Sequence, residues 1–197
     1  MRKLSVEHET EGELGTVYCD LVERRGKPAH DCHFTVRGGR TLPDGSYQRP
    51  VVVLMLNMPR PRGAVPSLLT LGAVENLFHE FGHAMHSMLG RTRYQHVTGT
   101  RCPTDFAELP SVLMEYFAGD VRVLRRFARH WQTGETVPDD QLRRLLHSRR
   151  SFAASELQQQ VLRNQSVNHT HNRSTAVCPG LQCFDAVGWA TGRASSL

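Results

Sequence analysis

The chain has 197 residues, a formal net charge of +5 and 39% hydrophobic residues, which is enough for one domain with a core of its own. It contains no run of about 18 apolar residues, and this excludes a transmembrane helix. Its five cysteines are odd in number and lack paired spacing, which argues against a disulfide framework and favours a reducing compartment.

The first sixty residues predict a small β-sheet over about residues 14–58. Residues 16–22 have the composition of a strand, and residues 33–37 alternate between apolar and polar side chains. Residues 51–56 form a continuous apolar run, which is typical of a strand covered on both faces. Residues 43–46 predict a turn between the last two strands. An exposed edge of such a sheet can hold an extended peptide by main-chain hydrogen bonds.

The short segment His30-Asp31-Cys32-His33 contains several metal-binding residue types. A structural metal site would need a second pair of ligands at a usable spacing, and the surrounding sequence offers none. We therefore interpret this segment as a loop that enters a strand.

A long helix is predicted over residues 71–89, because apolar side chains recur there at spacings of three and four. Thr70 is a suitable N-cap, and Gly90 is a suitable stop at the C-terminal end. Gly82 lies in the helix interior, where glycine costs about 1 kcal/mol relative to alanine. Its presence predicts that another segment packs closely against that turn.

The same helix contains the sequence His79-Glu80-Phe81-Gly82-His83. Two histidines at positions i and i+4 lie on one helix face, one turn apart, so both imidazoles can reach one tetrahedral metal ion. This HExxH pattern is typical of zinc peptidases, in which the glutamate accepts a proton from a water at the metal. The alternative is a core helix with two incidental histidines. We disfavour it, because Glu80 and both histidines would then be partly buried without a metal to satisfy them.

A catalytic zinc site needs a third protein ligand, and residues 104–119 predict a second helix that could supply it. One face of this helix is an apolar stripe formed by Phe106, Leu109, Leu113 and Phe117. Glu108 is our candidate ligand, because the 25 residues that separate it from His83 leave room for a loop and a returning helix. Asp105 and Glu115 are alternatives, better suited to hydrogen-bonding the ligand imidazoles. On the sequence pattern alone, a solvated acidic face is an equal alternative for Glu108.

Further helices are predicted over residues 120–132 and from Pro138 onward. The positive charge is concentrated in this region, in Arg122, Arg125, Arg126, Arg129, Arg143, Arg144, Arg149 and Arg150. Such a cluster can mark a nucleic-acid surface. A solvated helix face is the preferred interpretation, because no binding motif and no interleaved aromatic residues accompany the arginines.

Three segments together resemble the active-site block of the thimet-oligopeptidase-like metallopeptidases: residues 79–86, Gly99-Thr100, and residues 105–111. Position by position, the resemblance implies one Zn²⁺ per chain bound by His79, His83 and Glu108, with Glu80 as general base. It also suggests a smaller set of residues that contact the substrate or the zinc ligands, namely Gly99, Thr100, Asp105, Glu115 and His86.

The resemblance covers residues 1–161 and implies an α+β, mainly helical fold. This would be a partial zincin-type catalytic domain, with the small β-sheet next to the HExxH helix. Residues 162–197 are polar and aperiodic, so we expect a disordered tail.

The implied substrate is an unfolded or extended peptide. The implied role is to trim short N-terminal peptides from proteins imported into the mitochondrial matrix. The chain itself shows no transit segment, so we expect it to be cytosolic if expressed as it stands.

The family also uses a histidine and several tyrosines, located beyond the resembling region, to stabilise the oxyanion. The last tyrosine of this chain is Tyr116. Since loss of one oxyanion donor typically costs about a hundred- to thousand-fold in rate, we expect slow turnover. The alternatives to a zinc metalloendopeptidase are a catalytically inactive truncated product and, less favoured, a basic nucleic-acid-binding protein.

Overall fold

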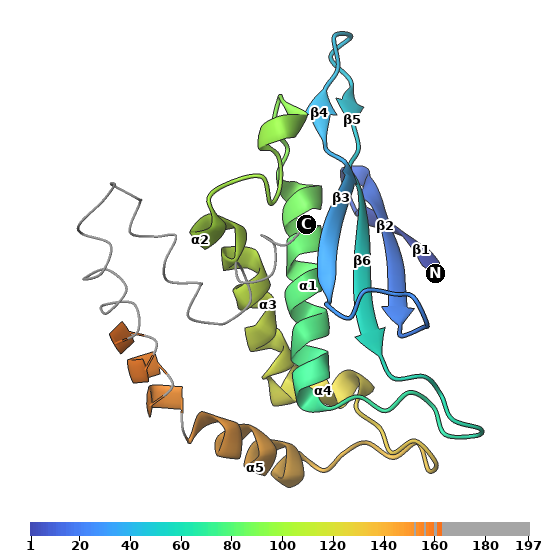
Figure 1. The fold of residues 1–197 in the computed structure, drawn as a ribbon, viewed down its shortest axis with the longest axis vertical. Helices are drawn as coiled ribbons and strands as arrows, with labels where there is room; N and C mark the ends of the chain where they lie inside the picture. Colours follow the sequence, from blue (N-terminus) through green and yellow to red (C-terminus); the bar gives the residue numbers. More distant parts are fainter. Residues whose placement is uncertain (152, 156, 160, 163–197) are drawn as a thin grey trace. The chain divides into compact units, whose positions relative to one another are not determined.

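The computed structural model describes residues 1–162 except Phe152, Glu156 and Gln160 (Figure 1). The chain forms two compact units. One contains Met1–Cys102 with Phe106–Thr136, and the other contains Pro103–Asp105 with Val137–Leu197. Apart from residue 162, the predicted disordered tail lies outside the described residues.

The first unit contains a four-stranded sheet with the order β1-β2-β6-β3. β2 and β6 are parallel, whereas the outer pairs β1–β2 and β3–β6 are antiparallel. The strands are β1 (Arg2–His8), β2 (Gly12–Val22), β3 (Cys32–Arg37) and β6 (Val51–Met58). The three strands predicted from composition and alternation are therefore confirmed, as is the interpretation of the segment before β3 as a loop entering a strand.

The prediction that the sheet starts near residue 14 was wrong, because β1 begins at Arg2. Six of the seven β1 residues are exposed and none is buried, and only Leu4 and Val6 are apolar, so the apolar pattern of this segment is short. Backbone pairing with β2, from Arg2 opposite Cys19 to His8 opposite Gly12, makes this segment a strand. Pairing of this kind depends on the neighbouring strand and leaves no pattern in the segment itself.

A small hairpin joins β3 to β6. It consists of β4 (Arg40–Thr41) and β5 (Tyr47–Gln48). The predicted turn lies at its tip, where Gly45 has a φ of 83° and the Asp44 carboxylate accepts a 2.9 Å hydrogen bond from the Ser46 amide. The turn prediction is therefore confirmed.

Helix α1 (Leu71–Leu89) has the predicted bounds, and the Thr70 hydroxyl caps it by accepting a 3.2 Å hydrogen bond from the Ala73 amide. α1 packs against the sheet (Figure 1). Their shared core consists of Leu14, Val17, Cys19, Val52, Leu54, Ala84 and Met88. The motif helix is thus held on a rigid support, because its C-terminal half is buried against strands β2 and β6.

The predicted single helix over residues 104–119 is wrong, since the segment forms α2 (Thr104–Ala107) and α3 (Leu109–Ala118). Glu108 lies at the junction between them. Pro110, in the first turn of α3, explains the break, because proline has no N–H to donate to a preceding turn and its ring clashes with the carbonyl four residues earlier. Because of this break, Glu108 lies at the end of a helix and not on the face of a continuous helix.

Small residues of α3 are buried more deeply than the predicted apolar stripe, and Ser111 lies against Gly82 of α1. Ser111 and Ala118 are fully buried, whereas the stripe residues are about half exposed: Phe106 56%, Leu109 57%, Leu113 53% and Phe117 48%. Small residues allow the two helix backbones to approach closely, and this approach determines the position of Glu108.

Helix α4 (Val121–Phe127) ends earlier than the predicted residue 132. The segment that follows forms a turn closed by a β-bridge between Arg129 and Thr136. The second unit contains α5 (Asp139–Arg150), which begins directly after Pro138 as predicted. Among the described residues, no helix combines the length and apolarity needed to span a bilayer.

Candidate metal centre

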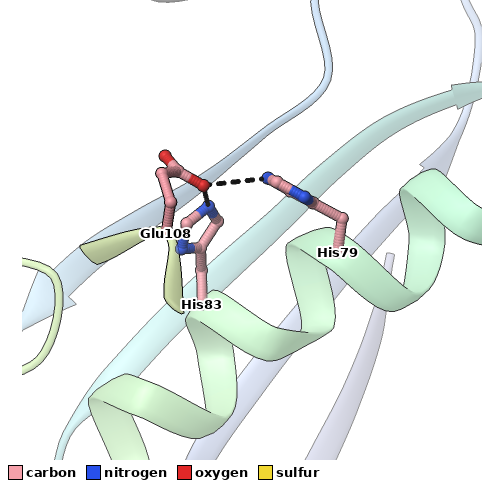
Figure 2. A group of neighbouring side chains, drawn as sticks. All are labelled: His79, His83 and Glu108. Carbon is pink, nitrogen blue, oxygen red and sulfur yellow. Dashed lines mark ion pairs between the residues drawn. The ribbon is translucent and has the colours of Figure 1, made fainter. Parts of the chain in front are cut away.

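Three side chains converge beside the middle of α1 (Figure 2). His79 and His83 project from the same face of α1, and Glu108 comes from the α2–α3 junction. The Glu108 Oε2 atom lies 3.2 Å from His79 Nε2 and 3.3 Å from His83 Nε2. All three candidate ligand atoms lie within 4.8 Å of one another.

Two of the three donor separations are close to those of a tetrahedral zinc ion. With zinc–ligand bonds of about 2.0–2.2 Å, two donors of a tetrahedral site lie roughly 3.3–3.6 Å apart. The two measured nitrogen–oxygen separations of 3.2 and 3.3 Å are close to that range. Two imidazoles and one carboxylate are also the donor set of many catalytic zinc sites, which keep their fourth position open.

The close approach of α1 and α3 brings Glu108 to the histidines. A Cβ atom on Gly82 would lie 2.6 Å from both the Pro110 carbonyl oxygen and Ser111 Cα. The predicted close packing at Gly82 is therefore confirmed, and the packing segment is the first turn of α3. The Ser111 hydroxyl also donates to Glu108 Oε2 at 2.7 Å, which orients the carboxylate.

Glu115, one turn from the end of α3, contacts the other side of the His79 ring. Its Oε1 atom lies 2.5 Å from His79 Nδ1. A carboxylate in this position fixes the tautomer of an imidazole, so that the opposite nitrogen is free to bind a metal. The structure thus places Glu115 where an orienting partner of a ligand would be.

The remaining candidate residues are not among the three converging side chains. The His86 ring packs edge-on against Phe106, with centroids 5.7 Å apart, and Asp105 is exposed on α2 in the second unit. Gly99 is buried with a φ of 56°, and a Cβ atom there would lie 2.8 Å from Ser87 Cα. Its close approach to α1 accounts for a glycine at this position, and Thr100 beside it is partly buried.

Glu80 lies on α1 between the two histidines and is only 3% exposed. Burial raises the pKa of its carboxyl group, and the nearby His83 and His79 partly oppose that shift. A carboxylate whose pKa is raised toward neutrality is a better proton acceptor than an ordinary surface glutamate.

Residue His33 of β3 was missed by the sequence interpretation. Its Nε2 atom lies 3.2 Å from Ser87 Oγ, and its ring centroid is 6.0 Å from that of His83. Burial lowers the pKa of His33 to about 4, and His83 and His86 add to the shift. No local pattern could have predicted this neighbour, because β3 and α1 meet only through tertiary packing.

The electrostatics of the metal-free site are dominated by its hydrogen bonds. Burial alone would lower the pKa of His79, but hydrogen bonds to Glu108 and Glu115 outweigh burial and raise that pKa to about 9. For Glu108, burial would raise the carboxyl pKa, but hydrogen bonds from His79, His83 and Ser111 outweigh it and lower that pKa.

These shifts predict a pH dependence of stability for the metal-free protein. The folded pKa of His79, about 9, exceeds its unfolded value near 6.5. Its contribution is therefore complete below about pH 6.5 and is lost as the pH rises through about 9. We expect a lower free energy of unfolding at about pH 9.5 than at about pH 6, measured by urea denaturation with a chelator present.

The variant Glu115→Gln is the control for this prediction, because it removes one of the two carboxylates whose hydrogen bonds raise the His79 pKa. Its stability should change less between the two pH values than that of the wild type. An equal decline in both proteins would assign the pH dependence to other groups.

Comparison with known proteins identifies a family and several relatives. The family profile of Peptidase family M3 matches residues 1–176. The chain is 65% identical over 161 residues to the mitochondrial intermediate peptidase of Pongo abelii, a match that covers 82% of this chain and 23% of that protein. The Homo sapiens protein of that name is 64% identical with the same coverage. The Arabidopsis thaliana protein is 50% identical over 159 residues, or 81% of this chain and 22% of the relative.

The chain thus spans less than a quarter of the length of these relatives. The family profile nevertheless extends over most of the chain, and the matched residues include the complete HExxH helix and Glu108. The resemblance inferred from the motifs is confirmed: the chain belongs to Peptidase family M3.

Proposed function

We propose that His79, His83 and Glu108 bind one Zn²⁺ ion and that the chain carries the centre of a zinc metalloendopeptidase of the zincin type. The observation that carries the proposal is the convergence of two imidazole nitrogens on one carboxylate oxygen, at 3.2 and 3.3 Å. Without a cation, this arrangement gathers one anionic and two basic groups in a partly buried place, which is costly unless a proton or a metal compensates.

Bound zinc would act as a Lewis acid that acidifies water and polarises the peptide carbonyl group. Glu80 supplies the acid–base chemistry in this proposal. Its carboxylate accepts the proton of the attacking water and then delivers it to the nitrogen of the leaving amine. The burial of Glu80, only 3% exposed, supports this role because burial raises its affinity for the proton.

The proposed substrate is an unfolded or extended peptide. Within the described sheet, β3 has a partner on one side only, and it lies next to α1. An extended peptide could add to the free side of β3 through main-chain hydrogen bonds, which depend little on the side chains of the peptide. By analogy with the names of its relatives, we propose mitochondrial precursors as substrates and the trimming of short N-terminal peptides as the reaction.

In this proposal residues 1–161 form the catalytic portion. Residues Gly99, Thr100, Asp105 and His86 remain candidates for contacts with the substrate. The slow turnover expected from the sequence also remains a prediction, and the following assay measures it.

The test combines metal content with peptide cleavage. After equilibration with zinc and removal of the excess, the wild type should retain about one zinc ion per chain, and His83→Ala should lose it. Glu80→Gln should keep the zinc, because Glu80 is not a ligand. Cleavage of an internally quenched peptide should fall about a hundred-fold or more in Glu80→Gln, since general-base catalysis typically contributes that much.

The matched control is His8→Ala, which removes an exposed histidine from β1. It should leave zinc content and cleavage unchanged. Zinc retention by His83→Ala would contradict the metal site, and equal cleavage by wild type and Glu80→Gln would contradict the assigned base.

A further inference from the structure

The two candidate histidine ligands are supported differently. His79 has a carboxylate partner, because its Nδ1 atom lies 2.5 Å from Glu115. His83 Nδ1 is buried and has no hydrogen-bond partner among the described residues. Among the described residues, the Nδ1 side of this ring thus has packing contacts in place of the hydrogen bond to a fixed acceptor that usually orients a metal-binding imidazole.

His33 is in a position to provide that packing. Its ring and that of His83 have centroids 6.0 Å apart and an interplanar angle of 34°, within the usual range for paired rings. His33 comes from β3, on the sheet side of α1, whereas Glu108 approaches from the α3 side. The His83 ring thus has His33 on one side and the Glu108 carboxylate, at 3.3 Å from Nε2, on another.

The His33 ring is itself held in place by α1. Its Nε2 atom lies 3.2 Å from Ser87 Oγ, and Ser87 is only 2% exposed. Gly99 packs against Ser87 so closely that a Cβ atom there would lie 2.8 Å from Ser87 Oγ. A continuous set of contacts therefore runs from the Gly99 loop through Ser87 to His33 and on to His83.

We propose that His33 is a positioning residue of the metal centre: its ring packs beside the His83 imidazole and holds it in the orientation that binds the metal. The proposal rests on the zinc site proposed above. It assigns to the β3 strand a role in shaping the metal site, in addition to any role in binding peptide.

Zinc affinity of the purified chain tests this role, measured by competition with a chromophoric chelator. His33→Ala should bind zinc about 10- to 100-fold more weakly, the usual cost of removing an outer partner of a ligand. His33→Phe keeps a ring beside His83 and loses only the contact with Ser87. It should therefore recover most of the affinity. The absorption bands of Co²⁺ bound in place of zinc should change in His33→Ala and return toward wild type in His33→Phe.

Two controls separate positioning from a general loss of structure. His8→Ala should bind zinc as the wild type does, and urea unfolding of each metal-free variant reports its stability directly. Wild-type zinc affinity and an unchanged Co²⁺ spectrum in His33→Ala would overturn the inference, as would equal losses in His33→Ala and His33→Phe. Failure of the wild type to bind zinc would instead contradict the proposed function, and the inference with it.

Discussion

Gly82→Ala is expected to lower the free energy of unfolding, because overpacking a close contact typically costs about 1–3 kcal/mol or more. Helix propensity alone favours alanine by about 1 kcal/mol, so the two effects have opposite signs. Packing should prevail, because the new Cβ atom would lie 2.6 Å from Pro110 O and Ser111 Cα, which are backbone atoms that no side-chain rotation can move away. Urea denaturation of the metal-free protein measures the difference.

The same substitution should weaken zinc binding. Moving the first turn of α3 away from α1 also moves Glu108, whose Oε2 atom must stay near both imidazoles. Gly119→Ala is the matched control. At the C-terminal end of α3, a Cβ atom would meet its nearest neighbours at 3.6 and 3.7 Å, which is ordinary contact. That variant should change stability by no more than about 0.5 kcal/mol, and equal effects of the two substitutions would contradict the packing argument.

Glu108→Gln is expected to reduce zinc affinity by more than about 100-fold. Loss of an outer partner typically costs 10- to 100-fold, and loss of a direct anionic ligand should exceed that. Glutamine preserves the size of the side chain, and its amide oxygen can still accept the hydrogen bond that Ser111 donates to Glu108. The charge of the ligand is therefore the main property that changes. Competition with a chelator of known affinity, at constant pH, gives the fold-change.

Two further variants are controls for the effect of Glu108→Gln on zinc affinity. Glu115→Gln alters the carboxylate beside His79 Nδ1 and leaves all three proposed ligands, so it should lose less affinity than Glu108→Gln. Glu23→Gln changes an exposed carboxylate at the surface and should have no effect. A greater loss in Glu115→Gln than in Glu108→Gln would mean that the third ligand has been misassigned.

Local sequence determined the motif helix and its chemistry. Thr70 and Gly90 delimit α1, apolar spacing predicts that the segment is a helix, and the i, i+4 histidines must share a face in any regular helix. Such features depend on residues within one or two turns of one another. For the same reason, the strand β6 and the turn at Gly45 were predictable from short segments.

Tertiary packing decided the rest of the site. A continuous helix over residues 104–119 would have made Glu108 one acid among several on a face. Pro110 breaks that helix, and the contact between Gly82 and Ser111 places the resulting junction beside His79 and His83. The sequence identified Glu108 as the preferred acid, but its distance from the imidazoles depends on how closely two helix backbones approach.

The position of β3 next to the site could likewise not be predicted from the sequence. His83 and Ser87 are far from His33 in the sequence, so no short-range spacing relates them to it. His33 contacts them only because β3 pairs with β6 and α1 packs on that sheet. Hydrophobic burial is non-directional. A pattern of apolar residues therefore indicates that a sheet and a helix will pack together, but it does not indicate which polar side chains will come into contact. The contacts between these polar side chains are determined by tertiary packing.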